Sequence, residues 1–108
     1  PTLLDLAGVP VPSQVDGRSL VPFLRGQRPA SWRTDFLVED LQGDLTGTLR
    51  SPAWSYTEWG SGGLELYDMK ADPWQMDSLH RKAEPSVLEA LAKRLHALEA
   101  CRGSSCRD

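Results

Sequence analysis

The sequence contains little cysteine and histidine, and it lacks any long hydrophobic run. Its 108 residues include two cysteines and two histidines. No apolar stretch approaches the roughly 20 residues that a membrane-spanning helix needs. The chain also begins without a methionine and without a charged segment followed by an apolar one. The sequence therefore predicts neither a membrane-spanning helix nor a signal peptide.

An excess of positive charge is absent as well. Lysine and arginine together number 12 against 15 aspartates and glutamates, which gives a formal net charge of −3. Binding to nucleic acid or to an anionic membrane needs a basic surface, because released counterions supply much of the affinity. We therefore expect neither nucleic acid nor a membrane among the partners of this chain.

The rest of the composition is typical of one small globular domain, in which four tryptophans are the unusual feature. The first eight residues, PTLLDLAG, have the pattern of a helix that is cut near its start and stopped by Gly8. This pattern predicts that the chain is a fragment of a longer protein, although removal of a methionine before Pro1 would leave the same beginning.

The two cysteines, Cys101 and Cys106, lie five positions apart in the polar tail CRGSSCRD. A disulfide between them would close a short loop, worth about 2 kcal/mol in the loop-entropy model. Half of a metal site is the rival interpretation, but two thiols without a neighbouring histidine fall short of four ligands. A redox-active cysteine pair normally has two intervening residues, whereas four residues separate these cysteines. The spacing favours a structural disulfide over two free thiols, and so an oxidising, extracytoplasmic compartment: secreted, periplasmic or lysosomal.

Alternation of apolar and polar residues predicts four short antiparallel strands in the middle of the chain. We expect them at residues 35–40, 48–50, 54–59 and 64–68. Residues 41–47 carry two glycines and predict a loose turn, and residues 60–63, all small, predict a hairpin loop.

Helical periodicity follows the strands. Leucines at positions 88, 91, 95 and 98 recur at spacings of three and four and predict a helix over 84–100 that packs on the sheet. Asp72-Pro73 predicts a shorter helix over about 73–80, with Met76 and Leu79 lying over the sheet edge and Trp74 nearby. Near the start, an extended strap over 9–12 precedes a helical turn over 20–24, which Ser19 caps and in which Leu20, Phe23 and Leu24 bury together. The fold class is therefore α+β, a small four-stranded antiparallel sheet with a C-terminal helix packed on one face.

Two stretches resemble landmarks of one family. The string Glu65-Leu66-Tyr67-Asp68, followed by Asp72-Pro73 and a closing Leu79, is similar to the C-terminal subdomain of the sulfatases, sulfuric ester hydrolases of the alkaline-phosphatase-like superfamily. The opening PTLLDLAGVPVPSQVDGRSLVPFLRG resembles a second landmark of that family, in the same order. The sequence departs from the family pattern at three positions. Trp74 stands where Tyr or Phe is usual, Ser78 where Asn is usual, and Ser55 where Lys is common.

The resemblance implies that residues 1–28 are the end of a catalytic-domain helix and a connecting strap, and that residues 29–108 are the C-terminal α+β subdomain. The parent enzyme would hydrolyse sulfate esters of a glycan or aryl substrate, using a divalent cation, Ca or Mg, and a formylglycine. That formylglycine is made from a Cys-x-Pro-x-Arg or Ser-x-Pro-x-Arg motif, which this sequence lacks. We therefore expect no catalytic residue, metal ligand or cofactor here. The expected partners are the catalytic domain of the same parent chain, which this subdomain would brace, and the sulfated substrate.

Substrate recognition is the one contribution to chemistry that the residues suggest. Arg50, Trp54, Tyr56 and Trp59 combine a guanidinium with aromatic faces, which suits a sulfated sugar, although core packing is the simpler interpretation for at least two of the aromatics. His80 and His96 lie in polar, helix-like stretches without a positioned serine, and His96 is expected to face solvent. Glu58 and Glu65 could face each other across a hairpin, as a surface feature rather than an acid–base pair.

A second class of function stays open at this stage. The chain could be a self-standing module that binds a glycan or a protein through its aromatic sheet face, without catalysis. A third possibility is a phosphotransferring relative with the same superfamily fold, to which the two landmarks are less similar. The sequence upstream of Pro1 would distinguish the sulfatase fragment from the self-standing module, because a Cys-x-Pro-x-Arg or Ser-x-Pro-x-Arg motif there would mark an enzyme.

Overall fold

The computed structural model of the protein describes residues 1–40, 42–44 and 46–107. The chain divides into two compact units. One comprises residues 1–33 with the tail from Cys101, and we call it the terminal unit; the other comprises residues 34–100, and we call it the sheet unit. The domain division after residue 28 concerns the parent enzyme and stays a prediction. The turn predicted over 41–47 includes residues 41 and 45, which lie outside the described residues.

The sheet unit is built on four antiparallel strands in the order β1-β2-β3-β4. The strands are β1 (Phe36–Asp40), β2 (Thr46–Arg50), β3 (Trp54–Trp59) and β4 (Leu64–Asp68). Their alternating sequences suit a sheet because side chains at successive positions point to opposite faces. The predicted strands are confirmed, with β1 starting one residue later and β2 starting two residues earlier than expected.

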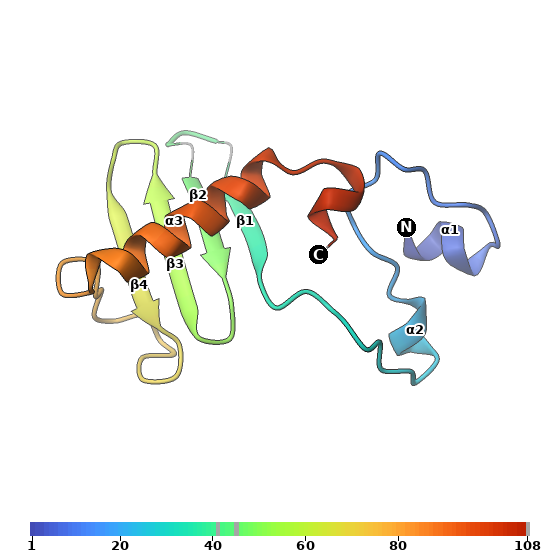
Figure 1. The fold of residues 1–108 in the computed structure, drawn as a ribbon, viewed down its shortest axis with the longest axis horizontal. Helices are drawn as coiled ribbons and strands as arrows, with labels where there is room; N and C mark the ends of the chain where they lie inside the picture. The colour runs from blue at the N-terminus through green and yellow to red at the C-terminus, as the bar shows by residue number, and fades with distance from the viewer. Residues whose placement is uncertain (41, 45, 108) are drawn as a thin grey trace. The chain divides into compact units, whose positions relative to one another are not determined.

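One face of this sheet is covered by the long helix α3 (Pro85–Ala100), which crosses the strands (Figure 1). The cross-strand register aligns Leu49, Tyr56 and Leu66 in one row on that face. Leu95 and Leu98 of α3 pack against this row, and the five side chains are the buried core. The predicted leucine stripe is therefore confirmed, with Leu88 and Leu91 partly buried at its other end.

An ion pair ties α3 to the start of β1. Arg94 donates from Nε and Nη2 to the two carboxylate oxygens of Asp35, each at 2.8 Å. The Asp35 side chain is 16% exposed, and a two-point arginine–carboxylate contact is stronger and more directional than a single bond. This pair fixes where the helix lies over the sheet.

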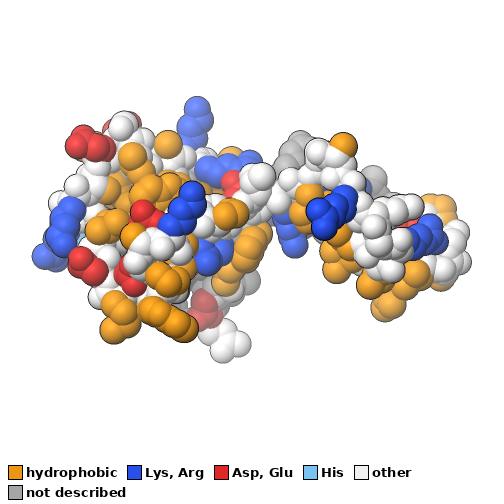
Figure 2. All heavy atoms as spheres, turned by 90° about the horizontal axis from the view of Figure 1, so that it is seen from below, with side chains coloured by type: hydrophobic (Ala, Val, Ile, Leu, Met, Phe, Trp, Pro, Cys, Tyr) orange, Lys and Arg blue, Asp and Glu red, His pale blue; other side chains and the backbone are white. Residues whose placement is uncertain are grey.

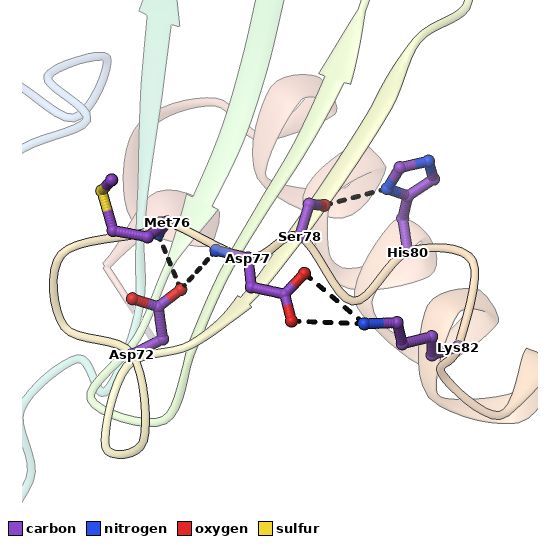
Figure 3. A network of polar contacts seen from close by, with 6 residues as sticks. All are labelled: Asp72, Met76, Asp77, Ser78, His80 and Lys82. Carbon is purple, nitrogen blue, oxygen red and sulfur yellow. Dashed lines mark hydrogen bonds and ion pairs between the residues drawn. The ribbon is translucent and has the colours of Figure 1, made fainter.

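The helix predicted over 73–80 is wrong. Gln75 adopts a left-handed φ of 56°, which ends helical geometry after Pro73. The Asp72 carboxylate does cap the segment, since its Oδ2 accepts hydrogen bonds from the amides of Met76 at 2.7 Å and Asp77 at 2.9 Å (Figure 3). The result is a series of turns instead of a helix.

These turns lead the chain back along the edge strand β4. Ser78 Oγ accepts a hydrogen bond from the Leu66 amide at 3.1 Å, and the Leu79 amide donates to the Leu66 carbonyl at 2.7 Å. Unpaired strand edges are prone to unwanted pairing, so these two bonds protect β4 at its centre. Leu79 packs against the core as expected, whereas Trp74 and Met76 do not lie over the sheet but are 83% and 84% exposed.

The described part of the terminal unit, residues 1–33 and 101–107, contains three short helices. They are α1 (Thr2–Leu6), α2 (Val21–Leu24) and the 3-10 helix η1 (Gly103–Cys106). Gly8 follows α1 with a φ of 70°, which confirms it as the stop of this helix. The disulfide between Cys101 and Cys106 is present, with an S–S distance of 2.00 Å. Among the described residues, no helix is both long and apolar enough to cross a membrane.

The helical turn near residue 20 forms, but its packing differs from the prediction. Ser19 Oγ accepts a hydrogen bond from the Val21 amide at 3.2 Å, so Ser19 stabilises the start of the turn. Val21 is the buried side chain of α2, while Leu20, Phe23 and Leu24 are exposed instead of buried together. A four-residue helix can bury only one side against a small unit, and here that side carries Val21.

We predict that Leu66→Ala lowers the free energy of unfolding by about 2–5 kcal/mol, because it opens a cavity at the centre of the core. Leu66 is 0% exposed. Urea denaturation followed by tryptophan fluorescence measures the effect. Leu64→Ala in the same strand is the matched control, since Leu64 is 38% exposed. An equal loss of unfolding free energy in the two variants would contradict the central place of Leu66 in the core.

Candidate functional site

The four predicted substrate contacts do not form one site. Strand alternation places Trp54 and Tyr56 on the α3 face, where Tyr56 belongs to the core and Trp54 packs against it. Trp59 lies on the opposite face and is 39% exposed. Arg50 is half-buried, and its Nη1 donates to the Ser51 carbonyl at 2.6 Å. Substrate contact by any of the four stays a prediction.

A polar chain runs from the core to the surface on the α3 side. The Tyr56 hydroxyl donates to Glu58 Oε1 at 2.8 Å, and His96 Nε2 of α3 lies 2.9 Å from Glu58 Oε2. Burial raises the pKa of Tyr56, and the bond to Glu58 raises it further, so the phenol stays protonated. The hydrogen bond to Glu58 also raises the pKa of His96. His96 is exposed, as expected, but it is paired rather than merely solvated.

The opposite face of the sheet holds a second polar group. Glu65 accepts hydrogen bonds from Trp59 Nε1 at 3.1 Å and from the Tyr67 hydroxyl at 3.0 Å. Burial raises the pKa of Tyr67, with Glu65 adding to the effect. Glu58 and Glu65 therefore lie on opposite faces of the hairpin, and the expectation that they could face each other is wrong. Each carboxylate is hydrogen-bonded to side chains on its own side of the sheet. The two are therefore not placed to act together as an acid–base pair.

Ser78 and His80 are a serine and a histidine in hydrogen-bond contact, as a nucleophile and its base would be. Ser78 Oγ lies 2.9 Å from His80 Nδ1 (Figure 3), but the same oxygen also accepts the bond from the Leu66 amide. No carboxylate bonds His80 among the described residues, so nothing there orients the imidazole as a third catalytic group would. The serine is part of the protected strand edge, which explains the contact without catalysis.

The residues of this chain do not fit a formylglycine or a resident cation. The sequence has no Cys-x-Pro-x-Arg or Ser-x-Pro-x-Arg motif. Within the described part of the chain, no group of three or more His, Cys, Asp or Glu side chains could hold a metal ion. No reaction step is therefore assigned to the sheet unit.

Sequence comparisons identify relatives along most of the chain, although no family model matches it. The chain is 29% identical to human N-acetylglucosamine-6-sulfatase over 99% of its length, and it covers 26% of that protein. It is 34% identical to the Delta 4,5-hexuronate-2-O-sulfatase of Bacteroides thetaiotaomicron over 92% of its length. It spans 21% of that second relative, so both relatives are several times longer than this chain.

Solved structures agree with the sequence comparisons. A protein determined in complex with its substrate D-glucosamine-2-N,6-O-disulfate matches 89% of the chain with a TM-score of 0.76 and 32% identity, over 22% of its own length. The phosphonate monoester hydrolase of Agrobacterium radiobacter matches 93% of the chain with a TM-score of 0.74 and 28% identity, over 23% of its own length. The described fold thus recurs as a small part of larger proteins.

We predict that His96→Gln destabilises the chain at acidic pH and has little effect at alkaline pH. The pKa of His96 is raised in the folded state, so its stabilisation is fully present below the unfolded pKa of about 6.5 and is lost as pH rises through the folded value. The effect is small because the pair is exposed. Melting temperatures at pH 5 and pH 8 measure it.

Glu58→Gln provides the control for this pH dependence. Without the carboxylate at position 58, replacing His96 should change the melting temperature by the same amount at both pH values. A His96→Gln effect that is as large at pH 8 as at pH 5 in the otherwise unchanged chain would contradict the ion pair.

Proposed function

We propose that this chain, which belongs to the sulfatase family of the alkaline-phosphatase-like superfamily, is the C-terminal part of an enzyme that hydrolyses sulfate esters of a glycan. Two sulfatases that act on sugar sulfates, by their names, are similar to nearly the whole chain but extend far beyond it. This match is the observation that carries the proposal. The parent reaction converts a sulfate ester and water into an alcohol and sulfate.

The role we propose for the chain itself is to brace the catalytic domain. Side chains that a complete small domain would bury are exposed here, and hydrophobic side chains reach the surface of both units (Figure 2). In the terminal unit these are Leu3, Leu6, Leu20, Phe23 and Leu24. On the sheet face opposite α3 they are Phe36, Val38 and Trp59. The occupant of these surfaces would be the catalytic domain, because the relatives carry most of their length outside the matched part.

The catalytic groups would come from that remaining part of the parent. A divalent cation, Ca or Mg, and a formylglycine are expected in the parent enzyme, and neither fits the residues described here. The chain's own residues would contribute the packing surface and, from the exposed edge of Trp59 and the half-buried Arg50, a candidate wall for the substrate.

We also propose an extracytoplasmic location for the parent enzyme. The Cys101–Cys106 disulfide supports it, since disulfides persist where the surroundings are oxidising.

We predict that the purified chain alone releases no sulfate from glucosamine 6-sulfate or from an aryl sulfate, because it lacks the nucleophile motif. The parent enzyme, expressed with its upstream sequence, should release sulfate from the sugar ester in the same assay. Clear turnover by the isolated chain would contradict the proposal. A parent that cleaves only phosphonate monoesters would instead support the relationship to the phosphonate hydrolase.

The bracing role makes a separate prediction about Leu24, which is 67% exposed. Leu24→Ser should leave the melting temperature of the isolated chain nearly unchanged but should destabilise the parent enzyme by roughly 1.5–3 kcal/mol, the value of burying one leucine side chain. Arg25→Ser at the next, also exposed, position is the control and should affect neither. No loss of stability in the parent with Leu24→Ser would count against docking through α2.

A further inference from the structure

A pocket in the terminal unit brings two arginines together. It has a volume of about 520 Å³ and is lined by Arg18, Ser31, Trp32, Ser104 and Arg107. Arg18 and Trp32 come from the chain before the sheet, whereas Ser104 and Arg107 come from the tail. None of these residues takes part in the contacts of the sheet unit described above.

Arg18 is held in place by an aromatic ring and two backbone carbonyls. Its guanidinium carbon lies 4.4 Å from the centre of the Trp32 ring, a cation–π arrangement. Its Nη1 donates to the Arg107 carbonyl at 3.2 Å, and its Nη2 donates to the Ser31 carbonyl at 3.3 Å. Phe23 packs edge-on against the same tryptophan with ring centres 4.6 Å apart. The guanidinium is therefore oriented before any ligand arrives.

Arg107 is fixed from the other side. Its Nε donates to the Val15 carbonyl at 3.1 Å, and its Nη2 donates to the same oxygen. The tail that carries it is closed by the disulfide and bound at Gly103, whose amide donates to Asp16 Oδ1 at 2.6 Å. Gly103 has a φ of 57°, and a side chain there would meet the Ser13 carbonyl oxygen at 2.5 Å, so this close approach needs a glycine.

Both arginines that line this pocket carry a positive charge. Among the described residues, neither guanidinium forms an ion pair with a carboxylate. A guanidinium has five N–H donors, and the bonds above use two from each arginine. Like charges that line one pocket repel each other, and an anion bound there would offset this repulsion and accept further hydrogen bonds.

We propose that this pocket binds a tetrahedral oxyanion, sulfate or phosphate, either free or as an ester on a sugar. Planar guanidinium groups match the oxygens of such anions at two points each. The Ser104 hydroxyl at the pocket wall adds a further donor. Trp32 is occupied by Arg18 and Phe23, so the pocket recognises the anionic group and not the face of a sugar ring.

Nuclear magnetic resonance titration of the chain at constant ionic strength tests the proposal. Sodium sulfate, sodium phosphate, glucosamine 6-sulfate and unmodified glucosamine are the four probes. Saturable shifts of the Arg18 and Arg107 side-chain signals and of the Trp32 indole are expected with the anions and not with glucosamine. Tighter binding of the sugar ester than of inorganic sulfate would assign the ligand to a saccharide, and the reverse would assign it to the free anion. Shifts that rise linearly without saturation for all three anions would overturn the proposal.

Matched variants separate a specific pocket from general attraction of anions. Arg18→Gln and Arg107→Gln should each weaken anion binding about tenfold, because each removes charged hydrogen bonds to the ligand. Arg102→Gln makes the same charge change in the disulfide loop, but Arg102 does not line the pocket, so binding should be unchanged. Equal weakening by all three variants would overturn the proposal.

The structural bonds of Arg107 need a separate check. Arg107→Lys keeps the charge but loses the paired donors, and it should also weaken sulfate binding while the Trp32 signal stays in its native position. If Arg107→Lys binds sulfate as well as the unchanged chain, the two-point contact is refuted.

Discussion

The structure depends on the burial of a leucine stripe against one row of the sheet. Leu49, Tyr56 and Leu66 align across three strands, and Leu95 and Leu98 of α3 cover them. Hydrophobic burial is the dominant favourable term in folding, and this cluster is the main core of the sheet unit. The ion pair between Arg94 and Asp35 then positions α3 over the sheet. The hydrogen bond from the Leu66 amide to Ser78 protects the edge strand β4.

The packing around this core suits the bracing role that we propose for the chain. The polar side chains around the core pair with one another, as Glu58 does with Tyr56 and His96, or satisfy the strand edge, as Ser78 does. Among the described residues, apolar side chains are exposed in α1, in α2 and on the sheet face opposite α3, and two arginines, Arg18 and Arg107, line one pocket. Both kinds of surface suit a subdomain that attaches to a larger hydrolase.

Local patterns predicted most of the fold but few of the long-range contacts. Strand alternation and leucine spacing are properties of neighbouring residues, so β3, β4 and α3 could be predicted from the sequence. The turns after Asp72 could not be predicted, because Asp72-Pro73 is a local signal for a helix start. In the structure this segment instead supplies hydrogen-bond partners to the backbone amide and carbonyl of Leu66. The pairing of His96 with Glu58 depends on how α3 is rotated on the sheet, and the contact of Arg18 with the Arg107 carbonyl joins residues 89 positions apart. Neither leaves a local signal in the sequence.

We propose that this chain belongs to a longer sulfatase, to which its exposed apolar surfaces attach. Mass spectrometry of the protein purified from its natural source, with sequencing of its peptides, tests this most directly. We expect a polypeptide several times longer than 108 residues that carries a Cys-x-Pro-x-Arg or Ser-x-Pro-x-Arg motif upstream of Pro1. An intact mass equal to that of the 108-residue chain alone would contradict it.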